Sequence, residues 1–71
     1  MNNTTFVHTF NVNDIVYCKN ADNTVHRGYV TCVKINFYGD WTDIVYLVNY
    51  GSKQDNFDSK RVFATAEEAF K

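Results

Sequence analysis

The chain has 71 residues, enough for one domain, and 45% of them are hydrophobic. Seven Lys and Arg residues against eight Asp and Glu residues leave a formal charge of −1, which supplies neither the basic surface of a duplex binder nor the dense acidity of a nucleic-acid mimic. No apolar run is long enough to cross a bilayer, and the N-terminus lacks the pattern of a secretory signal. We therefore expect a cytoplasmic protein with no membrane partner.

The N-terminal part of the sequence predicts a tail and a first strand. Residues 1–11 read as a polar tail, and residues 12–71 are expected to form the single folded domain. Apolar side chains then fall at every second position, which predicts a strand over residues 13–19. The four residues that follow, 20–23, are Asn, Ala, Asp and Asn. Asn and Asp side chains bond to the local backbone and tolerate left-handed conformations, so this segment predicts a turn.

Residues 24–37 form the longest β-like run, too long for one straight strand in so small a sheet. We expect the strand to bend at Gly28, where the missing side chain permits a bulge or a close approach of another strand. Val30 and either Cys32 or Val33 are then expected to point into the core.

The rest of the chain alternates short β-like runs with turn signals. The pattern predicts, in order, a turn at residues 38–40, a central strand at 42–50, a turn at 51–52, a strand at 53–57, a helical turn at 58–60 and a last strand at 61–63. Thr65 and Glu68 match a capping box, in which each residue bonds the other's backbone amide. A short helix is therefore expected over residues 66–70.

This order of elements resembles the Src-homology-3-like small β-barrels, mainly β proteins whose five strands curl into two orthogonally packed sheets. The resemblance is carried by Phe10-x-Val12-x-Asp14-x-Val16-Tyr17, Gly28-x-Val30, Tyr46-x-Val48-x-Tyr50-Gly51 and Val62-Phe63-x-Thr65-x-Glu67-Glu68-Ala69. The last segment is similar to the tail of short bacterial and bacteriophage barrel proteins, where a capped helix plugs one end. Asn13 stands where such barrels usually have glycine, and asparagine also tolerates a positive φ. The resemblance implies an SH3-like five-stranded barrel with a short C-terminal helix.

Cysteine and histidine residues are too few and too scattered for a metal site. A hairpin turning near residues 22–23 would separate Cys18 from Cys32 by about 16 Å, so we expect two reduced, buried thiols. His8 and His26 have no metal-like spacing to these cysteines. We expect neither a metal nor another cofactor.

The sequence has no glycine-rich phosphate loop and no nucleophile beside a recognisable base. Asp40 and Asp43 are best explained as turn-capping carboxylates, because a turn offers little shielding to shift a pKa. One enzyme with this type of barrel, the plasmid-borne trimethoprim-resistant dihydrofolate reductase, carries a Gln-Ile-Tyr motif. This chain has Gln54-Asp55-Asn56-Phe57 in the comparable strand, so we expect no enzyme.

Aromatic residues, 17% of the chain, concentrate around the turn at residues 38–40 and along the central strand. Barrels of the Tudor-like kind, which this fold resembles, use such clusters as cages for cationic groups, and other small barrels stack bases or proline-rich peptides on them. The alternative is that two or three of the rings complete the core. Trp41 is the ring most expected to stay partly exposed. The candidate binding residues are Tyr29, Phe37, Tyr38, Trp41, Tyr46 and Tyr50.

Five basic residues would line one face if the first, second and last strands are neighbours, although interspersed carboxylates favour a mixed, solvated surface. They are Lys19, Arg27, Lys34, Lys60 and Arg61.

We expect a non-enzymatic module that binds another protein, as an accessory factor of a phage or mobile element that acts on a host protein or inhibits a defence system. The enrichment in Asn, Lys, Tyr and Phe fits the AT-rich genome of many phages. The alternative is a single-stranded nucleic-acid-binding barrel, and self-association stays open.

Overall fold

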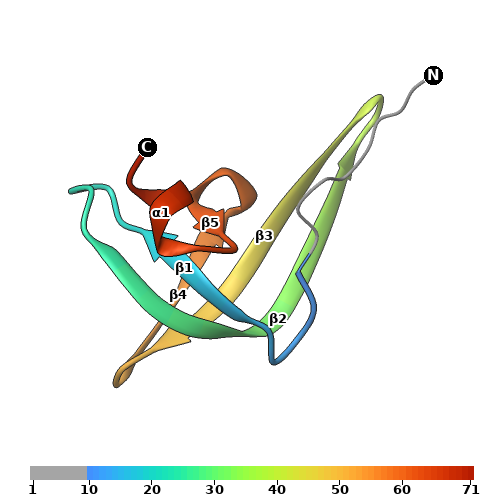
Figure 1. Cartoon of the computed structure of the whole chain (residues 1–71). Helices are drawn as coiled ribbons and strands as arrows, with labels where there is room; N and C mark the ends of the chain where they lie inside the picture. Colours follow the sequence, from blue (N-terminus) through green and yellow to red (C-terminus); the bar gives the residue numbers. More distant parts are fainter. Residues whose placement is uncertain (1–9) are drawn as a thin grey trace.

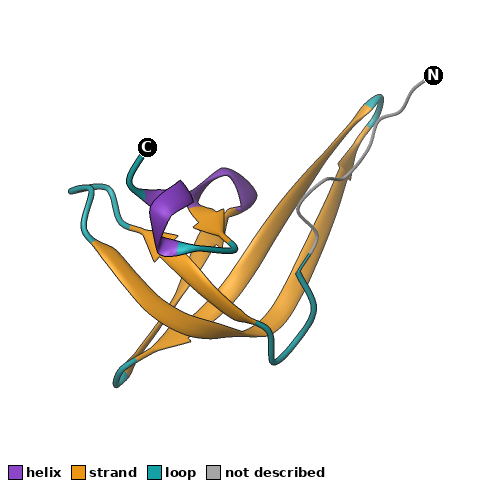
Figure 2. Cartoon of the chain, in the orientation of Figure 1, coloured by secondary structure: helices purple, strands orange, loops and turns teal. Residues whose placement is uncertain are grey.

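The computed structural model describes residues 10–71, which form five antiparallel strands and one short helix (Figures 1 and 2). The strands are β1 (Ile15–Lys19), β2 (Val25–Tyr38), β3 (Trp41–Tyr50), β4 (Lys53–Asp58) and β5 (Val62–Phe63). A 3-10 turn, η1 (Ser59–Arg61), precedes β5, and helix α1 (Ala66–Ala69) follows it. The expected mainly β chain and the order of its elements are confirmed, with bounds that differ by one or two residues. The expected tail lies almost wholly outside the described residues.

The five strands form one bent sheet in the order β4-β3-β2-β1-β5 (Figure 1). Strand β1 lies between β2 and β5, so the first, second and last strands are neighbours, as expected. The outer strands β4 and β5 do not pair with each other within residues 10–71, and the sheet is therefore open there. With two residues, β5 is only long enough to pair with β1 at Tyr17 and Cys18, so the expected closure of a barrel is not observed.

Residues with positive φ shape the tight connections. Gly39 (φ 66°) and Gly51 (φ 62°) each occupy the first position of a two-residue hairpin loop, the place that a type II′ turn reserves for glycine. Asn23 (φ 70°) closes the loop between β1 and β2 by donating its N–H to the carbonyl of Asn20 at 2.8 Å. Asn13 also has a positive φ, 79°, so the expectation that asparagine adopts this conformation here is confirmed.

The core lies on the inner face of the bent sheet, under α1 and β5 (Figure 1). Its buried side chains are Val16, Cys18, Val30, Tyr46, Val48, Tyr50, Phe57, Val62 and Ala69. Tyr46 is the largest fully buried side chain, and its hydroxyl accepts the backbone N–H of Phe10 at 3.1 Å. Phe10 also packs edge-on against the Tyr46 ring, with ring centroids 5.5 Å apart. The N-terminal end of the described chain is thereby held on the core.

Strand β2 contains a bulge at Thr31, where its register against β3 shifts between Val30 and Cys32. Successive side chains of a strand alternate between faces, so one extra residue exchanges the two faces beyond it. Val30 and Val33 consequently lie on the same inner face although they are three positions apart, and Cys32 lies on the outer face. Of the two expected alternatives, Val33 is therefore the inward residue.

Gly28 makes the close backbone approach that its position predicts, whereas the bulge falls at Thr31. A Cβ at Gly28 would lie 2.3 Å from the backbone oxygen of Asn49 on β3. Both cysteines are free, but only Cys18 is buried, since Cys32 faces outward and is half-buried. The expectation of two buried thiols is wrong for Cys32, because the bulge turns it out of the core.

Candidate binding site

The longest strands extend beyond the rest of the sheet as a two-stranded ribbon (Figure 1). Strand β2 pairs with β1 as far as Tyr29, and strand β3 pairs with β4 from Val45 onward. Between these limits β2 and β3 pair only with each other among the described residues. We call residues 33–44 the ribbon. A ribbon of this kind presents two faces and two strand edges to solvent.

The outer face of the ribbon ends in a stacked aromatic pair. Tyr38 and Trp41 face each other across the turn, with ring centroids 4.5 Å apart and planes inclined by 21°. Tyr38 is 49% exposed and Trp41 is 58% exposed, so the stack is open to solvent on its free sides. Asp40 lies in the turn itself. Asp43, opposite Asn36, lies on the outer face in the next pair away from the turn on that face. The tip therefore combines flat apolar rings with two carboxylates.

The inner face of the ribbon continues the apolar surface of the core. Val33 and Ile44 are half-buried and pack against the core residues. Ile35, which pairs with Ile44, is 51% exposed, and Phe37 beyond it is 77% exposed. The apolar stripe thus runs from the core outward and becomes more exposed with each pair toward the turn.

The expected aromatic face is divided by the structure into three separate places. Phe37, Tyr38 and Trp41 lie near the tip of the ribbon, Phe37 on its inner face and the other two on its outer face, and the expected exposure of Trp41 is confirmed. Tyr46 and Tyr50 are buried in the core, because they lie on the inner face of β3 beneath the packed elements. They are not part of an accessible face, and the alternative that some rings complete the core holds for them.

Tyr29 lies apart from the other candidate rings, on the outer face of the sheet. It is opposite Ile15 on β1 and Asn49 on β3, and the Asn49 side-chain amide donates to its hydroxyl at 3.2 Å. These residues line a shallow surface hollow together with Arg27 and two glycines. Tyr29 is 41% exposed, and its pairing with Asn49 places it outside the ribbon.

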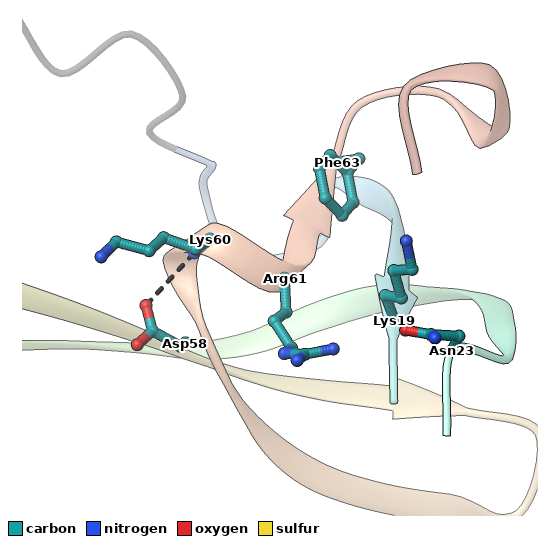
Figure 3. Close-up of a pocket in the computed structure, with 6 residues that line it drawn as sticks. All are labelled: Lys19, Asn23, Asp58, Lys60, Arg61 and Phe63. Carbon is teal, nitrogen blue, oxygen red and sulfur yellow. Dashed lines mark hydrogen bonds between the residues drawn. The ribbon is translucent and has the colours of Figure 1, made fainter. Parts of the chain in front are cut away.

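Three of the five expected basic residues meet around another surface hollow, between β1 and η1 (Figure 3). Lys19, Lys60 and Arg61 line it with Asn23, Asp58 and Phe63. The Arg61 guanidinium donates to the carbonyl of Asn20 at 3.1 Å. In Figure 3 the Lys60 side chain extends away from Arg61, so the three cations do not converge on one point.

The other two basic residues lie outside this hollow, so the five do not gather in one place. Arg27 lies beside Tyr29 on the outer face of the sheet, and Lys34 lies on the ribbon beyond the bulge. The reason is the length of β2, which carries Lys34 past the end of β1 and away from β5. Within residues 10–71 there is no group of three or more His, Cys, Asp or Glu side chains arranged to hold a metal. In the same part of the chain, no helix has the length and apolar character needed to span a membrane.

Two buried groups make the free energy of unfolding depend on pH in the alkaline range. Burial raises the pKa of the Cys18 thiol above its ordinary value. The hydrogen bond that the Tyr50 hydroxyl donates to the Asp55 carboxylate raises the pKa of Tyr50, and burial adds to this effect. In both cases the unfolded chain loses the proton at a lower pH than the folded chain.

We therefore expect stability to be constant from about pH 7 to about pH 8.5 and to fall above about pH 9. Urea unfolding at a series of pH values measures this decline. In a Cys18→Ala variant the fall should begin at higher pH, where only Tyr50 still contributes. An identical pH profile for this variant and the wild type would contradict the assignment to Cys18.

Sequence reasoning did not select Val33, Ile35 and Ile44 as surface residues, although they form most of the apolar stripe. Ordinary β-branched residues in a strand predict core positions, and no local signal marks where a strand leaves its sheet. The one available signal was the excess length of the second β-like run. The Tyr50–Asp55 hydrogen bond was likewise not foreseen, because it joins residues on two strands.

No protein-family model matches the chain, and no curated protein or solved structure is similar to it at a significant level.

Proposed function

We propose that the chain is a non-enzymatic binding module that holds a protein partner on the outer face of the ribbon. The observation that carries the proposal is the exposed stack of Tyr38 and Trp41 at the end of a projecting hairpin. Tryptophan and tyrosine dominate the residues that contribute most to protein interfaces, because each buries a large area and loses few rotatable bonds. In this chain the two rings already fix each other, which lowers the entropy lost on binding further.

The charge of the tip favours a protein with basic side chains as the partner. Asp40 and Asp43 lie beside the stack, and the ribbon carries only one basic residue, Lys34, on its far side from the turn. A lysine or arginine of the partner would be attracted both by these carboxylates and by the face of the Trp41 ring. Nucleic-acid phosphates would be repelled at the same place, so bases are poor candidates for stacking on Trp41.

The proposal extends to the finer architecture and to biological context. We assign the chain to the SH3-like small-barrel type, in which the bent sheet supports a binding surface on its loops and hairpins. Within this assignment, the partner is a host protein, and the chain is an accessory factor of a phage or mobile element that occupies a surface on it. A gene neighbourhood of early phage genes would support this context, and a neighbourhood of housekeeping genes would count against it.

The experiment that tests the binding role is affinity capture from a host lysate followed by titration of the captured protein. Trp41→Ala is expected to weaken binding about 30-fold, since loss of a central aromatic anchor costs about 2 kcal/mol. Tyr29→Ala is the matched control, because it removes an exposed ring from another part of the outer face, and it should change the affinity less than about threefold. Equal effects of the two substitutions would overturn the ribbon as the binding surface, as would the absence of any captured protein over a range of salt concentrations.

A second candidate function, single-stranded nucleic-acid binding, has one observation in its favour. Lys19 and Arg61 line a hollow with the ring of Phe63, a combination that suits a phosphate beside a base. Anisotropy titration with labelled oligonucleotides at low salt tests it, with Arg61→Glu as the variant. Binding that weakens with Arg61→Glu and with added salt would favour this function over the first.

A further inference from the structure

Among the described residues, nothing pairs with one edge of strand β2 along the whole ribbon. Within residues 10–71, β1 pairs with β2 no further than Tyr29, and two more backbone hydrogen bonds join Val30 to the segment before β1. From Cys32 to Tyr38 the opposite edge of β2 pairs with β3. The free edge therefore extends over seven residues, from the bulge at Thr31 to the turn at Gly39. An exposed, long and partly apolar strand edge is a template for another strand.

The pairing pattern determines which backbone groups point outward from this edge. The N–H and C=O of Val30 bond to Asp14 and Asn13, away from β3. The bulge at Thr31 shifts the alternation by one residue, so that Val33 is the next residue whose backbone N–H and C=O point away from β3. The other end agrees, because Tyr38 closes a two-residue hairpin and must bond to Trp41. The residues whose backbone groups point out from the free edge are therefore Val33, Ile35 and Phe37.

We propose that a second copy of the chain pairs antiparallel with this edge, with Ile35 on the two-fold axis. Ile35 is the midpoint of the free edge from Cys32 to Tyr38, so this register gives the longest overlap. It places Ile35 opposite Ile35 of the second copy, and Val33 opposite Phe37. The backbone groups of all these residues point out from the edge, and each such pair in an antiparallel ladder exchanges two backbone hydrogen bonds. A two-fold contact of this kind is closed, so it makes a dimer and not a filament.

The side chains on the inner face match in this register. Val33, Ile35 and Phe37 lie on the apolar stripe, where Ile35 and Phe37 are exposed in the single chain. Pairing would set a β-branched residue opposite an aromatic ring on each side of a central isoleucine pair, a favourable cross-strand combination. The stripes of the two copies would then form one continuous apolar surface.

Charges on the outer face select the same register. Lys34 would stand opposite Asn36 of the second copy, and Asn36 pairs with Asp43 on β3. The lysine of each copy is thus directed toward a carboxylate of the other. Centring the contact on Lys34 would instead place two lysines directly opposite each other, which is unfavourable.

The other free edges fit a second copy less well. The outer edge of β4 is strongly polar, with Lys53, Asp55 and Asp58 along it. The free part of β3 on the ribbon covers only residues 41–44. The proposed dimer leaves the Tyr38–Trp41 stack on the outer face, away from the apolar stripe. It therefore goes beyond the proposed binding function and does not depend on it.

Sedimentation velocity over a concentration series, from about 10 µM to about 1 mM, tests the proposal. We expect the mass to rise from that of one 8.3 kDa chain to twice that value. Ile35→Lys should weaken the dimer at least about tenfold, because it sets two like charges opposite each other on the two-fold axis. Thr42→Lys, on the free edge of β3, is the matched control and should leave the association unchanged. Circular dichroism checks that both variants are folded.

Cysteine trapping supplies an independent measurement of the register. In a Cys32→Ser background, Ile35→Cys should form an intermolecular disulfide on mild oxidation, since hydrogen-bonded antiparallel partners have Cα atoms about 5.5 Å apart. Thr42→Cys in the same background should not. A single-chain mass at every concentration would overturn the proposal. It would also be overturned by a dimer that Ile35→Lys does not weaken, or by a dimer that forms only after residues 1–9 are removed.

Discussion

Replacing Tyr46 by alanine is expected to lower the free energy of unfolding by about 3–5 kcal/mol. Tyr46 is the largest fully buried side chain of the core, and it lies on β3 opposite Val33 on one side and Phe57 on the other. Its removal would leave a cavity at the point where the ribbon joins the sheet. Proteins of this length are stable by about 4–10 kcal/mol, so the variant should lose a large part of its stability.

Tyr46→Phe separates the packing of the ring from the hydrogen bond of the hydroxyl. This variant keeps the ring contacts with Phe10 and removes the acceptor for the Phe10 N–H, so we expect a loss of about 1 kcal/mol. Urea unfolding followed by circular dichroism measures both variants. A loss below about 1 kcal/mol for Tyr46→Ala would mean that Tyr46 does not organise the core.

Gly28→Ala is expected to be the most disruptive single methyl addition in the sheet, with a cost of about 3 kcal/mol. The added Cβ would lie 2.3 Å from the backbone oxygen of Asn49 and 3.0 Å from Val48 Cγ1. A backbone atom cannot rotate away as a side chain can, so β2 and β3 would have to separate at this point. Thermal or urea unfolding of the variant gives the cost directly.

Gly51→Ala is the matched control for this substitution. Gly51 has open space around its Cα but a positive φ of 62°, so alanine there should cost only about 1 kcal/mol through backbone strain. If Gly28→Ala proves no more destabilising than Gly51→Ala, the close approach of β2 to β3 does not constrain the fold.

Features that depend on neighbouring residues were predictable from the sequence. The turns at Gly39 and Gly51 follow from the need for positive φ in two-residue hairpins. The Thr65 cap was also predictable, and its hydroxyl accepts the N–H of Glu68 at 3.2 Å. Because such local preferences bracket every element, the order of strands along the chain could be derived without knowledge of the packing.

Features that depend on register were not predictable in the same way. The bulge at Thr31 reverses the two faces of β2, and no residue type at that position signals an extra residue. Beyond the bulge, alternation alone could not tell whether Cys32 or Val33 faces the core. The separation of Lys34 from Lys19 was not predictable for a related reason, because it depends on where β1 stops pairing with β2.

Barrel closure and the accessible aromatic surface were beyond sequence reasoning because they depend on strand ends. Strands β4 and β5 form the two outer edges and do not pair with each other, so the sheet stays open within the described residues. Tyr46 and Trp41 lie on the same strand, yet one is fully buried and the other is exposed. The difference arises because Tyr46 lies on the inner face, whereas Trp41 lies on the outer face beyond the point where β4 stops pairing with β3.

The fluorescence of Trp41 tests whether the ribbon tip is the surface that binds a partner. Trp41 is the single tryptophan of the chain, so its emission reports on the tip alone if the partner lacks tryptophan or is labelled with a non-fluorescent analogue. We predict that acrylamide quenches Trp41 strongly in the free chain and that saturation with the captured partner reduces this quenching severalfold. Full partner binding with unchanged quenching of Trp41 would show that the partner binds elsewhere.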